Sequence, residues 1–426
     1  MLAEQKGTAA EQAHASPSRG ATARLNRLFG KLDDAGVRWC LLRPAATLAQ
    51  AAGDIDLLVD PSNLERVRTL LASEQFVALP VRGGDLHMGD YDRDGDRFLW
   101  LHVQTEVRLG SDALTARTVL DTVEHVPLPQ PARAWLFWLL LLHDILDKGE
   151  IPDRHRPELA RLAVDVGGAA APLRAIAERQ GLEPEATIAM VRDGEWAQLG
   201  ALPRDTTAPA LRERALAAVG RIAGAWGGRG RSFSVSWRRR GLSVAIIGPD
   251  GAGKTTLVNG LRTALPFPTY VVYMGLTGGR LPRADALRVP GVVLAARLAL
   301  LWGRYVVGLL HRARGRIVIY ERYALDGLVP SGARLGPLAK LSRRVQAVAV
   351  PQPELVLLLD ASGVIMHSRS GEYDPVQLEQ WRAAYRRLRG CVRALEILDA
   401  ERPPDAVRRD AQARIWECYT ERWRHA

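Results

Sequence analysis

The sequence is poor in cysteine and in aromatic residues. The first shortage argues against a disulfide-bonded protein, and the second against a nucleic-acid-binding protein. The chain of 426 residues has three cysteines, Cys40, Cys391 and Cys418, which lie far apart and lack the spacing of a metal site. They argue against a disulfide framework and predict a reducing, cytoplasmic environment. Aromatic residues make up only 6% of the chain, and the net charge of +11 comes mainly from arginines spread along it, so nucleic acid is not the expected partner.

The sequence also lacks a secretory signal and an uninterrupted run that could span a membrane. Residues 1–22 are rich in Ala, Gln, Ser and Gly, have no apolar core and are predicted to be disordered. The apolar run Ala134–Leu142 is too short to cross a bilayer. Val289–Leu310 is long enough, but Arg297 and Arg304 interrupt it seven residues apart on one helical face. A buried helix is therefore expected there, and no membrane span.

The remaining composition is that of a globular protein with more than one domain. Hydrophobic residues make up 47% of the chain and charged residues 25%, and the length favours two or three domains. Shifts in composition indicate an α+β domain, a helical segment, a basic linker and an α/β domain, at residues 23–131, 132–225, 226–240 and 241–426. The linker is expected to be solvated, with a contact to nucleic acid or to an acidic surface as the alternative.

Residues 248–255 form a complete phosphate-binding loop (P-loop), with the sequence Gly-Pro-Asp-Gly-Ala-Gly-Lys-Thr. The apolar run Leu242–Ile247 precedes it, as expected for a strand buried on both faces, and an amphipathic helix pattern follows it. In such loops backbone N–H groups surround a phosphate, Lys254 reaches the β- and γ-phosphates, and the Thr255 hydroxyl ligates Mg²⁺. The sequence therefore predicts that ATP and Mg²⁺ bind here. The residues expected to hold the nucleotide are Gly248, Asp250, Gly251, Ala252, Gly253, Lys254, Thr255 and Thr256.

Apolar runs in the C-terminal block alternate with helical stretches, which is the pattern of βαβ units. The five runs are 244–248, 270–274, 317–320, 355–359 and 395–398. They predict an α/β fold with a five-stranded parallel sheet, whose ligands bind at the carboxyl ends of the strands.

Two of these runs are followed by a carboxylate, Glu321 and Asp360. In P-loop enzymes a carboxylate at such a strand end holds the Mg²⁺ that bridges the β- and γ-phosphates, so Glu321 is expected to share the metal with Thr255. Arg322, directly after Glu321, can bind an acceptor phosphate or the transferring phosphoryl group through a bidentate contact. The alternatives are a structural ion pair for Glu321 and Arg322, and a helix cap for Asp360.

The C-terminal block resembles the thymidylate kinase group of nucleoside monophosphate kinases over about residues 241–420. The similar segments are 248–256, 321–323 and 353–360. The resemblance implies a P-loop kinase fold in which Asp250 contacts the sugar of the acceptor nucleotide. It also implies that Glu321 and Arg322 stand in the place of the family's Asp–Arg pair.

Further arginine roles follow from the same resemblance. It implies a mobile lid whose arginine closes over the phosphates, for which Arg369 is the candidate, and an arginine before the Glu-Arg-Tyr strand that binds the acceptor, either Arg304 or Arg297. The family's Arg-Glu-Pro-Gly-Gly segment is replaced by residues 273–280, which keep glycines but lack the Glu-Pro pair. The acceptor can therefore be a thymidylate-type nucleotide, another nucleotide, a nucleoside or a sugar-like group.

The N-terminal block carries Asp54 and Asp56 at i and i+2 of a strand pattern, so both carboxylates point to one face. Paired aspartates of this kind hold the ions in two-metal nucleotidyl transfer. With residues 41–44 they resemble the nucleotidyltransferase superfamily, but Gln104 stands where the third carboxylate is expected, and Glu106 is the nearest substitute. An active transferase, a degenerate nucleotide-binding or regulatory domain, and a chance match all stay open.

The stretch 143–148, with the sequence His-Asp-Ile-Leu-Asp-Lys, follows an apolar helix pattern. It is expected to be the polar end of that helix, with a metal or proton-transfer site as the alternative.

The sequence thus favours an ATP-dependent kinase that transfers a γ-phosphoryl group to a small-molecule acceptor, with a nucleoside monophosphate of the thymidylate type as the leading class. Catalysis would come from positioning and charge neutralisation by Lys254, Glu321, Arg322 and Arg369. An NTP-hydrolysing switch or assembly factor, and a nucleotidyltransferase with an accessory P-loop domain, are the alternatives. Residues 23–130 are expected to have lost nucleotidyl transfer, and a homodimer is compatible with the sequence.

Overall fold

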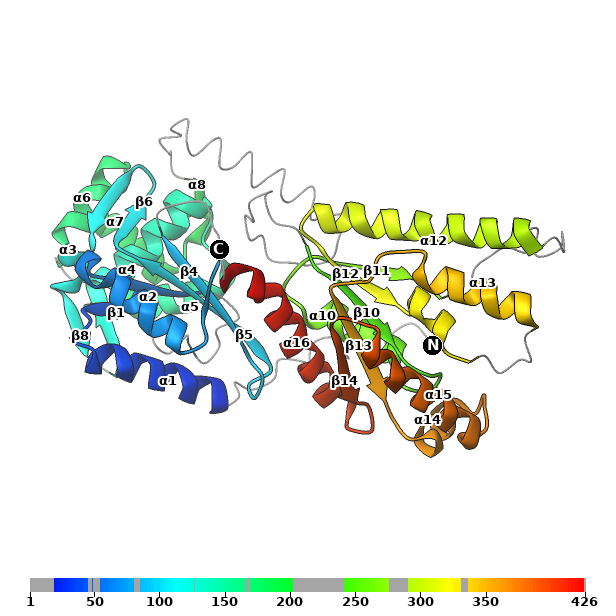
Figure 1. The fold of residues 1–426 in the computed structure, drawn as a ribbon. Coiled ribbons are helices and arrows are strands. Elements are labelled where there is room, and N and C mark those ends of the chain that lie inside the picture. The colour runs from blue at the N-terminus through cyan, green and yellow to red at the C-terminus, as the bar shows by residue number, and fades with distance from the viewer. Residues whose placement is uncertain are drawn as a thin grey trace, which may run out of the picture. The chain divides into compact units, whose positions relative to one another are not determined.

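The chain divides into two compact units, residues 1–222 and 223–426, in the computed structural model (Figure 1). Within these units the structure describes residues 19–44, 48, 54–79, 85–125, 127–164, 166, 169–201, 241–275, 290–330 and 336–424. The predictions for the residues before 19, for the linker 226–240 and for residues 276–280 lie outside the described part of the chain. Each unit is described by itself.

A mixed five-stranded sheet forms the centre of the first unit. β2 (Ile55–Val59) lies between β1 (Trp39–Leu41) and β5 (Arg97–Gln104), and it runs antiparallel to β1 and parallel to β5. β4 (Leu86–Asp92) and β3 (Val77–Leu79) follow beyond β5, each antiparallel to its neighbour. The strand pairs outside this sheet are β6 (Glu106–Leu109) with β7 (Asp112–Thr115), and β8 (Val123–His125) with β9 (Pro129–Pro131).

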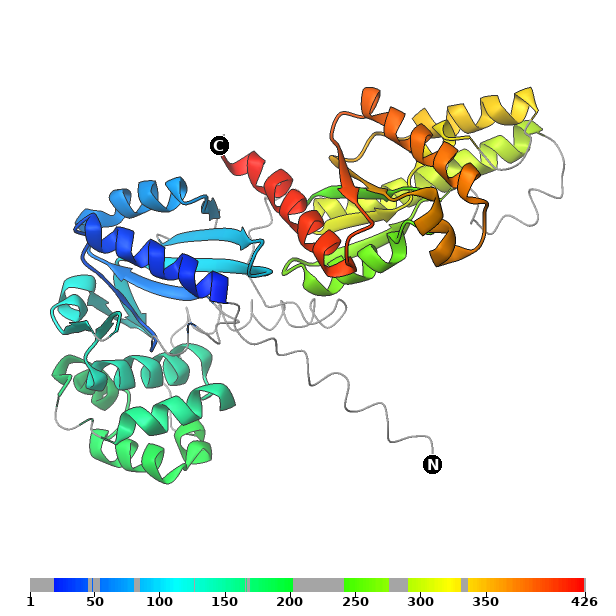
Figure 2. The ribbon, with the colours of Figure 1, turned by 90° about the horizontal axis from the view of Figure 1, so that it is seen from below.

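Helices cover both faces of this sheet. Successive side chains of β2 point to opposite faces, so they enter two different cores. Leu57 belongs to the core with α1 (Arg19–Asp34) and α2 (Leu64–Ser73), whereas Leu58 belongs to the core with the helical segment that follows the sheet. Figure 2 shows α1 and α2 on one side of the sheet and the helical segment on the other. Since α1 is already helical at residues 19–22, the prediction of disorder is wrong there.

The predicted helical segment is present from α4 onwards and is described as far as residue 201. Its first helix, α4 (Arg133–Leu142), is buried along almost its whole length, so this apolar run is a core helix. The other helical elements of the unit are α3 (Ala116–Leu120), η3 (His143–Lys148), η4 (Asp153–His155), α5 (Arg156–Ala163), α6 (Ala171–Arg179), α7 (Pro184–Asp193) and α8 (Trp196–Ala201).

The second unit is built on a five-stranded sheet in which every neighbouring pair is parallel. In order across the sheet the strands are β11 (Thr269–Tyr273), β12 (Ile317–Glu321), β10 (Ser243–Ile247), β13 (Leu355–Asp360) and β14 (Leu395–Asp399). The predicted five-stranded parallel sheet is therefore confirmed. β10 and β13 are buried at every residue, as expected for strands with helices on both faces.

Helices of the second unit lie on both sides of this sheet (Figure 2). α10 (Lys254–Ala264) and α16 (Pro404–Arg424) contact each other on one side. α12 (Pro290–Ala313), α13 (Pro337–Val348) and α15 (Pro375–Arg387) lie on the other, and the short α14 (Gly363–Ser370) follows β13. The strand order reverses at β10, so ligands are expected at its carboxyl end.

α12 is only partly buried, whereas the sequence predicts a buried helix here. One side packs on β11 and β12, but large apolar side chains on the other side are exposed, among them Trp302 at 45% and Leu310 at 51%. Among the described residues, 291–313 form one helix that is long and apolar enough to cross a membrane, by length and composition alone. The prediction of burial is wrong because the sheet covers only one side of the helix.

Candidate active site

The P-loop connects β10 to α10 at the carboxyl edge of the parallel sheet. Three of its glycines, Gly248, Gly251 and Gly253, have positive φ angles of 145°, 83° and 94°, which residues with a side chain adopt only with strain. A Cβ on Gly251 would lie 2.3 Å from the carbonyl oxygen of Met366 in α14, so this position also needs glycine for space. These glycines give the loop a left-handed backbone, in which successive N–H groups can form an anion-binding concavity.

Lys254 is the first residue of α10, and its side chain turns back over the loop. Its Nζ donates to the carbonyl oxygens of Gly248 at 2.9 Å and Pro249 at 2.6 Å. Burial lowers the pKa of Lys254, and the positive charge of Arg322 lowers it further. The ammonium group is thus already largely out of water at the place where a phosphate would bind.

Arg322 follows β12 and pairs with Asp250 of the P-loop. Its backbone N–H donates to the carbonyl oxygen of Ile246 at 3.0 Å, and its φ is 62°. A left-handed conformation is costly for a residue with a side chain and is typical of functional positions. Burial would lower the pKa of Arg322, but the carboxylates of Asp250 and Asp326 raise it, so the guanidinium stays charged.

Thr255 and Glu321 form the other pair at this edge. The Thr255 hydroxyl donates to Oε1 of Glu321 at 2.5 Å. The β10–β12 register pairs Glu321 with Ile246, close to the carboxyl end of β10 where the loop begins. A hydroxyl and a carboxylate are the protein ligands that Mg²⁺ uses in P-loop enzymes, where phosphate and water oxygens complete its coordination. No group of three His, Cys, Asp or Glu suited to a metal occurs among the described residues.

Sequence reasoning did not find the buried pair of Asp326 and Tyr385. Asp326 lies in the short helix η5 (Ala324–Leu328), and the Tyr385 hydroxyl of α15 donates to it at 2.9 Å. Burial raises the pKa of Asp326, whereas Arg322 and Lys254 lower it, and burial also raises the pKa of Tyr385. Asp326 is therefore a buried carboxyl group that interacts electrostatically with Lys254 and Arg322. No local motif marks Tyr385 in the sequence.

Asp360 at the end of β13 is part of an ion pair. Its two oxygens accept from Arg382 of α15, each at 2.8 Å, while Ser362 is the N-cap residue of α14. The helix-cap interpretation of Asp360 is therefore wrong. Arg369, the predicted lid arginine, lies in the last turn of α14 and donates to the carbonyl oxygen of Ala400 at 2.9 Å.

Arg304 of α12 reaches the carboxyl edge from the β11 side. Its guanidinium donates to the carbonyl oxygen of Gly275 at 3.2 Å and lies 5.9 Å from the centre of the Tyr273 ring. Burial lowers the pKa of Arg304. Arg297, the other predicted acceptor arginine, lies about two turns earlier along α12.

The predicted residues Lys254, Thr255, Glu321 and Arg322 therefore meet at the carboxyl ends of β10 and β12. Asp250 joins them, since it contacts both Lys254, at 3.4 Å, and Arg322. In the same loop Ala252 is buried, and Thr256 is exposed on the first turn of α10. Cations, a hydroxyl and a carboxylate around a glycine loop can bind phosphates and stabilise the charge that develops in phosphoryl transfer.

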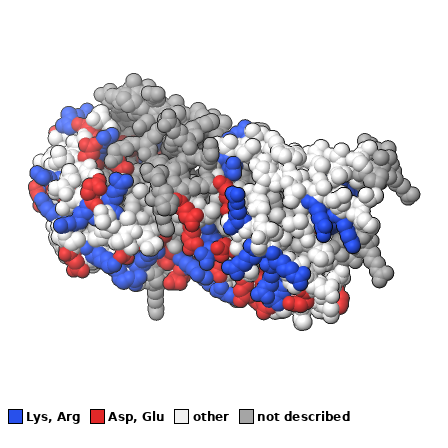
Figure 3. Space-filling view, viewed as in Figure 1, with Lys and Arg blue, Asp and Glu red and all other residues white. Residues whose placement is uncertain are grey.

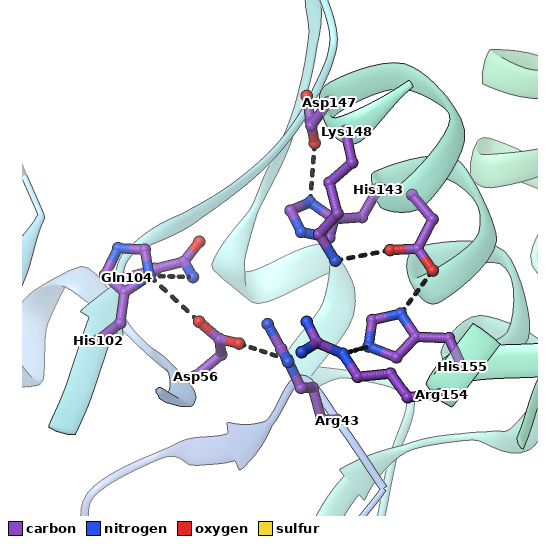
Figure 4. Close-up of polar contacts among 10 residues, drawn as sticks. Arg43, Asp56, His102, Gln104, His143, Asp147, Lys148, Arg154 and His155 are labelled. Carbon is purple, nitrogen blue, oxygen red and sulfur yellow. Dashed lines mark hydrogen bonds and ion pairs between the residues drawn. The ribbon is translucent and has the colours of Figure 1, made fainter. Parts of the chain in front are cut away.

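The first unit holds a second group of charged residues (Figure 4). Asp56 in β2 pairs with Arg43 through Nε at 2.6 Å and with His102 through Nδ1 at 3.2 Å. His102 faces Asp56 in the β2–β5 register, and its Nε2 lies 3.3 Å from Asp85. Burial would raise the pKa of Asp56, but His102 and Arg43 lower it. Burial would lower the pKa of His102, but the two carboxylates raise it.

These residues do not fit the two metal ions of nucleotidyl transfer. The two oxygens of Asp56 already contact Arg43 and His102, and Asp54 precedes β2 instead of lying within it. Gln104 ends β5, where its Nε2 lies 3.0 Å from His102 Nδ1, and Glu106 belongs to the separate strand β6. A histidine and an amide thus occupy the position where the metal ions would require a carboxylate.

The segment 143–148 is a π-helix that continues α4 and ends at Gly149, so it is the polar end of this helix, as predicted. Asp144 is fully buried there, with its carboxylate 2.6 Å from Nδ1 of His155 and 2.7 Å from Nζ of Lys148. Burial would raise the pKa of Asp144, but these two contacts lower it. The burial of Asp144 was not predictable from the sequence, because its partner His155 belongs to the separate element η4.

The two groups of residues, around Lys254 and around Asp56, have to be interpreted from their own geometry. Comparison with known proteins does not assign the chain to a family, since no family model matches its sequence and no curated protein matches it.

Proposed function

We propose that the protein is an ATP-dependent phosphotransferase that moves a γ-phosphoryl group to a small acceptor. The observation that carries this proposal is the meeting of Lys254, Arg322 and the Thr255–Glu321 pair at a glycine-lined loop on a helix N-terminus. Positive charge from the helix end and from Lys254 attracts the donor phosphates, and Arg322 lies beside them. This combination favours phosphoryl transfer over simple nucleotide binding.

The donor nucleotide would be held by the chain itself. Backbone N–H groups of the P-loop and the Lys254 ammonium would bind the phosphates, and Thr255 with Glu321 would hold Mg²⁺. The ion, when bound, neutralises charge between the β- and γ-phosphates. Lys254 would exchange its carbonyl partners for phosphate oxygens, and its desolvated position strengthens that attraction.

The acceptor would lie at the β11 side of the site, where Arg304 and Arg322 present guanidinium groups. Arginines bind phosphate oxygens in a bidentate manner, so an acceptor that already carries a phosphate fits them. Tyr273 is 38% exposed beside Arg304 and offers a ring face for a base. A nucleoside monophosphate of the thymidylate type is therefore the proposed acceptor class.

The test is a reaction of the full-length chain with Mg·ATP and a panel of nucleoside monophosphates, nucleosides and sugars, followed by mass spectrometry. ADP together with an equal amount of phosphorylated acceptor is the expected result. ADP with free phosphate would instead identify an NTP-hydrolysing switch, and pyrophosphate would identify nucleotidyl transfer.

Lys254→Ala should lower this turnover by several orders of magnitude, because it removes the cation that contacts the donor phosphates. Lys340→Ala, at an exposed lysine of α13, is the matched control and should leave turnover unchanged. Turnover close to wild type in Lys254→Ala would contradict the P-loop assignment.

A further inference from the structure

Basic side chains gather in the first unit near Asp56, and the proposed phosphotransferase site does not include them. They come from three places in the chain: Arg43 follows β1, His143 begins the π-helix η3, and Arg154 lies in η4. In Figure 4 the outer ends of these three side chains point toward one another. His143 is also close enough to Asp56 to lower the pKa of that carboxyl group. Three segments of the chain thus direct hydrogen-bond donors to one region of this unit.

The two arginines are held at their inner nitrogen. Nε of Arg43 pairs with Asp56 at 2.6 Å, and Nε of Arg154 donates to Nε2 of His155 at 3.3 Å. Within the part of the chain that the structure describes, the Nη atoms of both guanidinium groups make no hydrogen bond or ion pair, and Arg154 has no carboxylate partner. Two like charges that point toward each other repel, so an anion between them would stabilise this arrangement.

Carboxylates fix the orientation of the other donors. Asp144 contacts Nδ1 of His155 at 2.6 Å, which leaves Nε2 of this ring to accept from Arg154. Asp147 contacts Nδ1 of His143 at 2.9 Å, so Nε2 is the ring nitrogen that His143 can offer to a ligand. The direction of each donor is therefore set before any ligand binds.

The donors are accessible to solvent, whereas the carboxylates that hold them are mostly buried. The side chains of Arg43 and His143 are 32% and 40% exposed, and Arg154 is an exposed residue. The side chains of Asp56 and Asp144 are 13% and 0% exposed. A ligand can thus reach donors that are already ordered, which lowers the side-chain entropy lost on binding.

We propose that Arg43, His143 and Arg154 bind the phosphate group of a small phosphorylated molecule without a metal ion. A phosphate ester presents three terminal oxygens in different directions, which suits donors from three segments, and guanidinium groups bind such oxygens in pairs. A carboxylate has only two oxygens in one plane. A metal ion is not expected to take part, because the two oxygens of Asp56 already contact Arg43 and His102. This inference does not depend on the proposed phosphotransferase activity, which belongs to the other unit.

The test is amide hydrogen exchange of the full-length chain, followed by mass spectrometry while inorganic phosphate is titrated in the presence of a chelator. A local measurement is needed, because the P-loop of the second unit is also proposed to bind phosphates. Exchange in residues 143–155 should slow and reach saturation, since the bound anion would connect η3 to η4. Adding Mg²⁺ in place of the chelator should not change the phosphate concentration at half effect.

Arg154→Ala removes one guanidinium group at an exposed position, so the fold should survive, which circular dichroism checks. The phosphate concentration at half effect should rise about tenfold or more, because charge-assisted hydrogen bonds are lost. His143→Ala, at a partly exposed side chain, should shift it in the same direction. Arg68→Ala is the matched control and should change nothing. This arginine is 56% exposed on α2, which covers the opposite face of the sheet (Figure 2).

Glucose 6-phosphate and AMP, titrated in the same way, show whether a sugar or a nucleoside carries the phosphate, according to which of them binds more tightly. Malonate tests the preference for phosphate over carboxylate. The proposal would be overturned by unchanged exchange in residues 143–155 at high phosphate, by an unchanged titration in Arg154→Ala, by a requirement for Mg²⁺, or by tighter binding of malonate than of phosphate.

Discussion

At the scale of the residue, Gly251 and Gly253 provide a matched test of why these two loop positions are glycine. Both have positive φ angles, so alanine at either position strains the backbone by about 1–3 kcal/mol. At Gly251 the new Cβ would also lie 2.3 Å from the carbonyl oxygen of Met366, whereas at Gly253 it meets nothing within 4 Å. We expect Gly251→Ala to lower both the Tm and the affinity for ATP more than Gly253→Ala does, as measured by thermal unfolding and calorimetry. Equal losses would show that the contact with α14 adds nothing.

Glu321→Gln tests the predicted metal site at the same scale. The amide keeps the shape of the side chain and can still contact the Thr255 hydroxyl, but it removes the negative charge that favours a divalent ion. We expect the Mg²⁺ concentration for half-maximal turnover to rise at least tenfold (about 1.4 kcal/mol), while ATP affinity in the presence of a chelator stays unchanged. Glu372→Gln, at an exposed glutamate between α14 and α15, is the control. An unchanged Mg²⁺ requirement would leave Glu321 as a structural residue.

Some residues of the candidate site could be predicted from the sequence, and others could not. The P-loop and its neighbours Glu321 and Arg322 were predictable because a contiguous motif and two strand ends carry them. The pairs Asp360–Arg382 and Asp326–Tyr385 were not, because each joins residues that only the packing of α15 on the sheet brings together. For Asp360 the sequence left a metal-binding carboxylate and a helix cap both open, and only the structure shows its ion pair with Arg382.

At the scale of the element, the π-helix 143–148 depends on one buried charge. Asp144 is held by His155 and Lys148, and its pKa lies below the ordinary value of 3.8. Its contribution to stability is therefore complete above this pH and is lost as the pH falls through the lowered pKa of the folded state. Asp144→Asn should cost about 1.5–3 kcal/mol at neutral pH, because the neutral amide loses the charge-assisted hydrogen bonds that the buried carboxylate makes with Lys148 and His155.

Thermal unfolding as a function of pH measures this effect. The difference between wild type and Asp144→Asn should be large at neutral pH and should shrink toward acid. Asp147→Asn, in the same π-helix, is the control, because its side chain is 32% exposed beside His143 and should matter less. A difference that is equally large at all pH values would mean that packing, and not the charge, accounts for the loss.

Elements were predictable wherever a hydrophobic pattern has a single explanation. The five strands of the parallel sheet are short, mostly apolar runs between helical stretches, and all were located from these runs. α12 was also located, but its burial was predicted wrongly, because a helix that is apolar around most of its circumference does not reveal which side the sheet covers. The distribution of exposed side chains along α12 and α13 needed the structure.

At the scale of the whole molecule, the division into two units predicts that the two groups of charged residues can be changed separately. The double variant Asp54→Asn, Asp56→Asn removes negative charge from the first unit only. Since these residues do not fit two-metal transfer, phosphoryl transfer to a small acceptor should stay within about twofold of wild type, a change of roughly 0.4 kcal/mol. Turnover and pyrophosphate release, measured side by side, check this.

A wild type that releases pyrophosphate, and a double variant that does not, would contradict this expectation. In that case Glu106 or another carboxylate would have to complete a working site in the first unit. Glu150→Gln, at an exposed glutamate of the same unit, controls for a general effect of charge.

α12 has one further consequence for the molecule, because it carries two kinds of surface on a single rigid rod. Arg304 points to the carboxyl edge of the sheet, whereas Val306, two residues later, is exposed at 43%. A ligand that draws Arg304 toward itself and an apolar surface that covers Val306 would therefore act on the same helix. Thermodynamic linkage then requires reciprocity: if the ligand strengthens association by some factor, association strengthens ligand binding by the same factor.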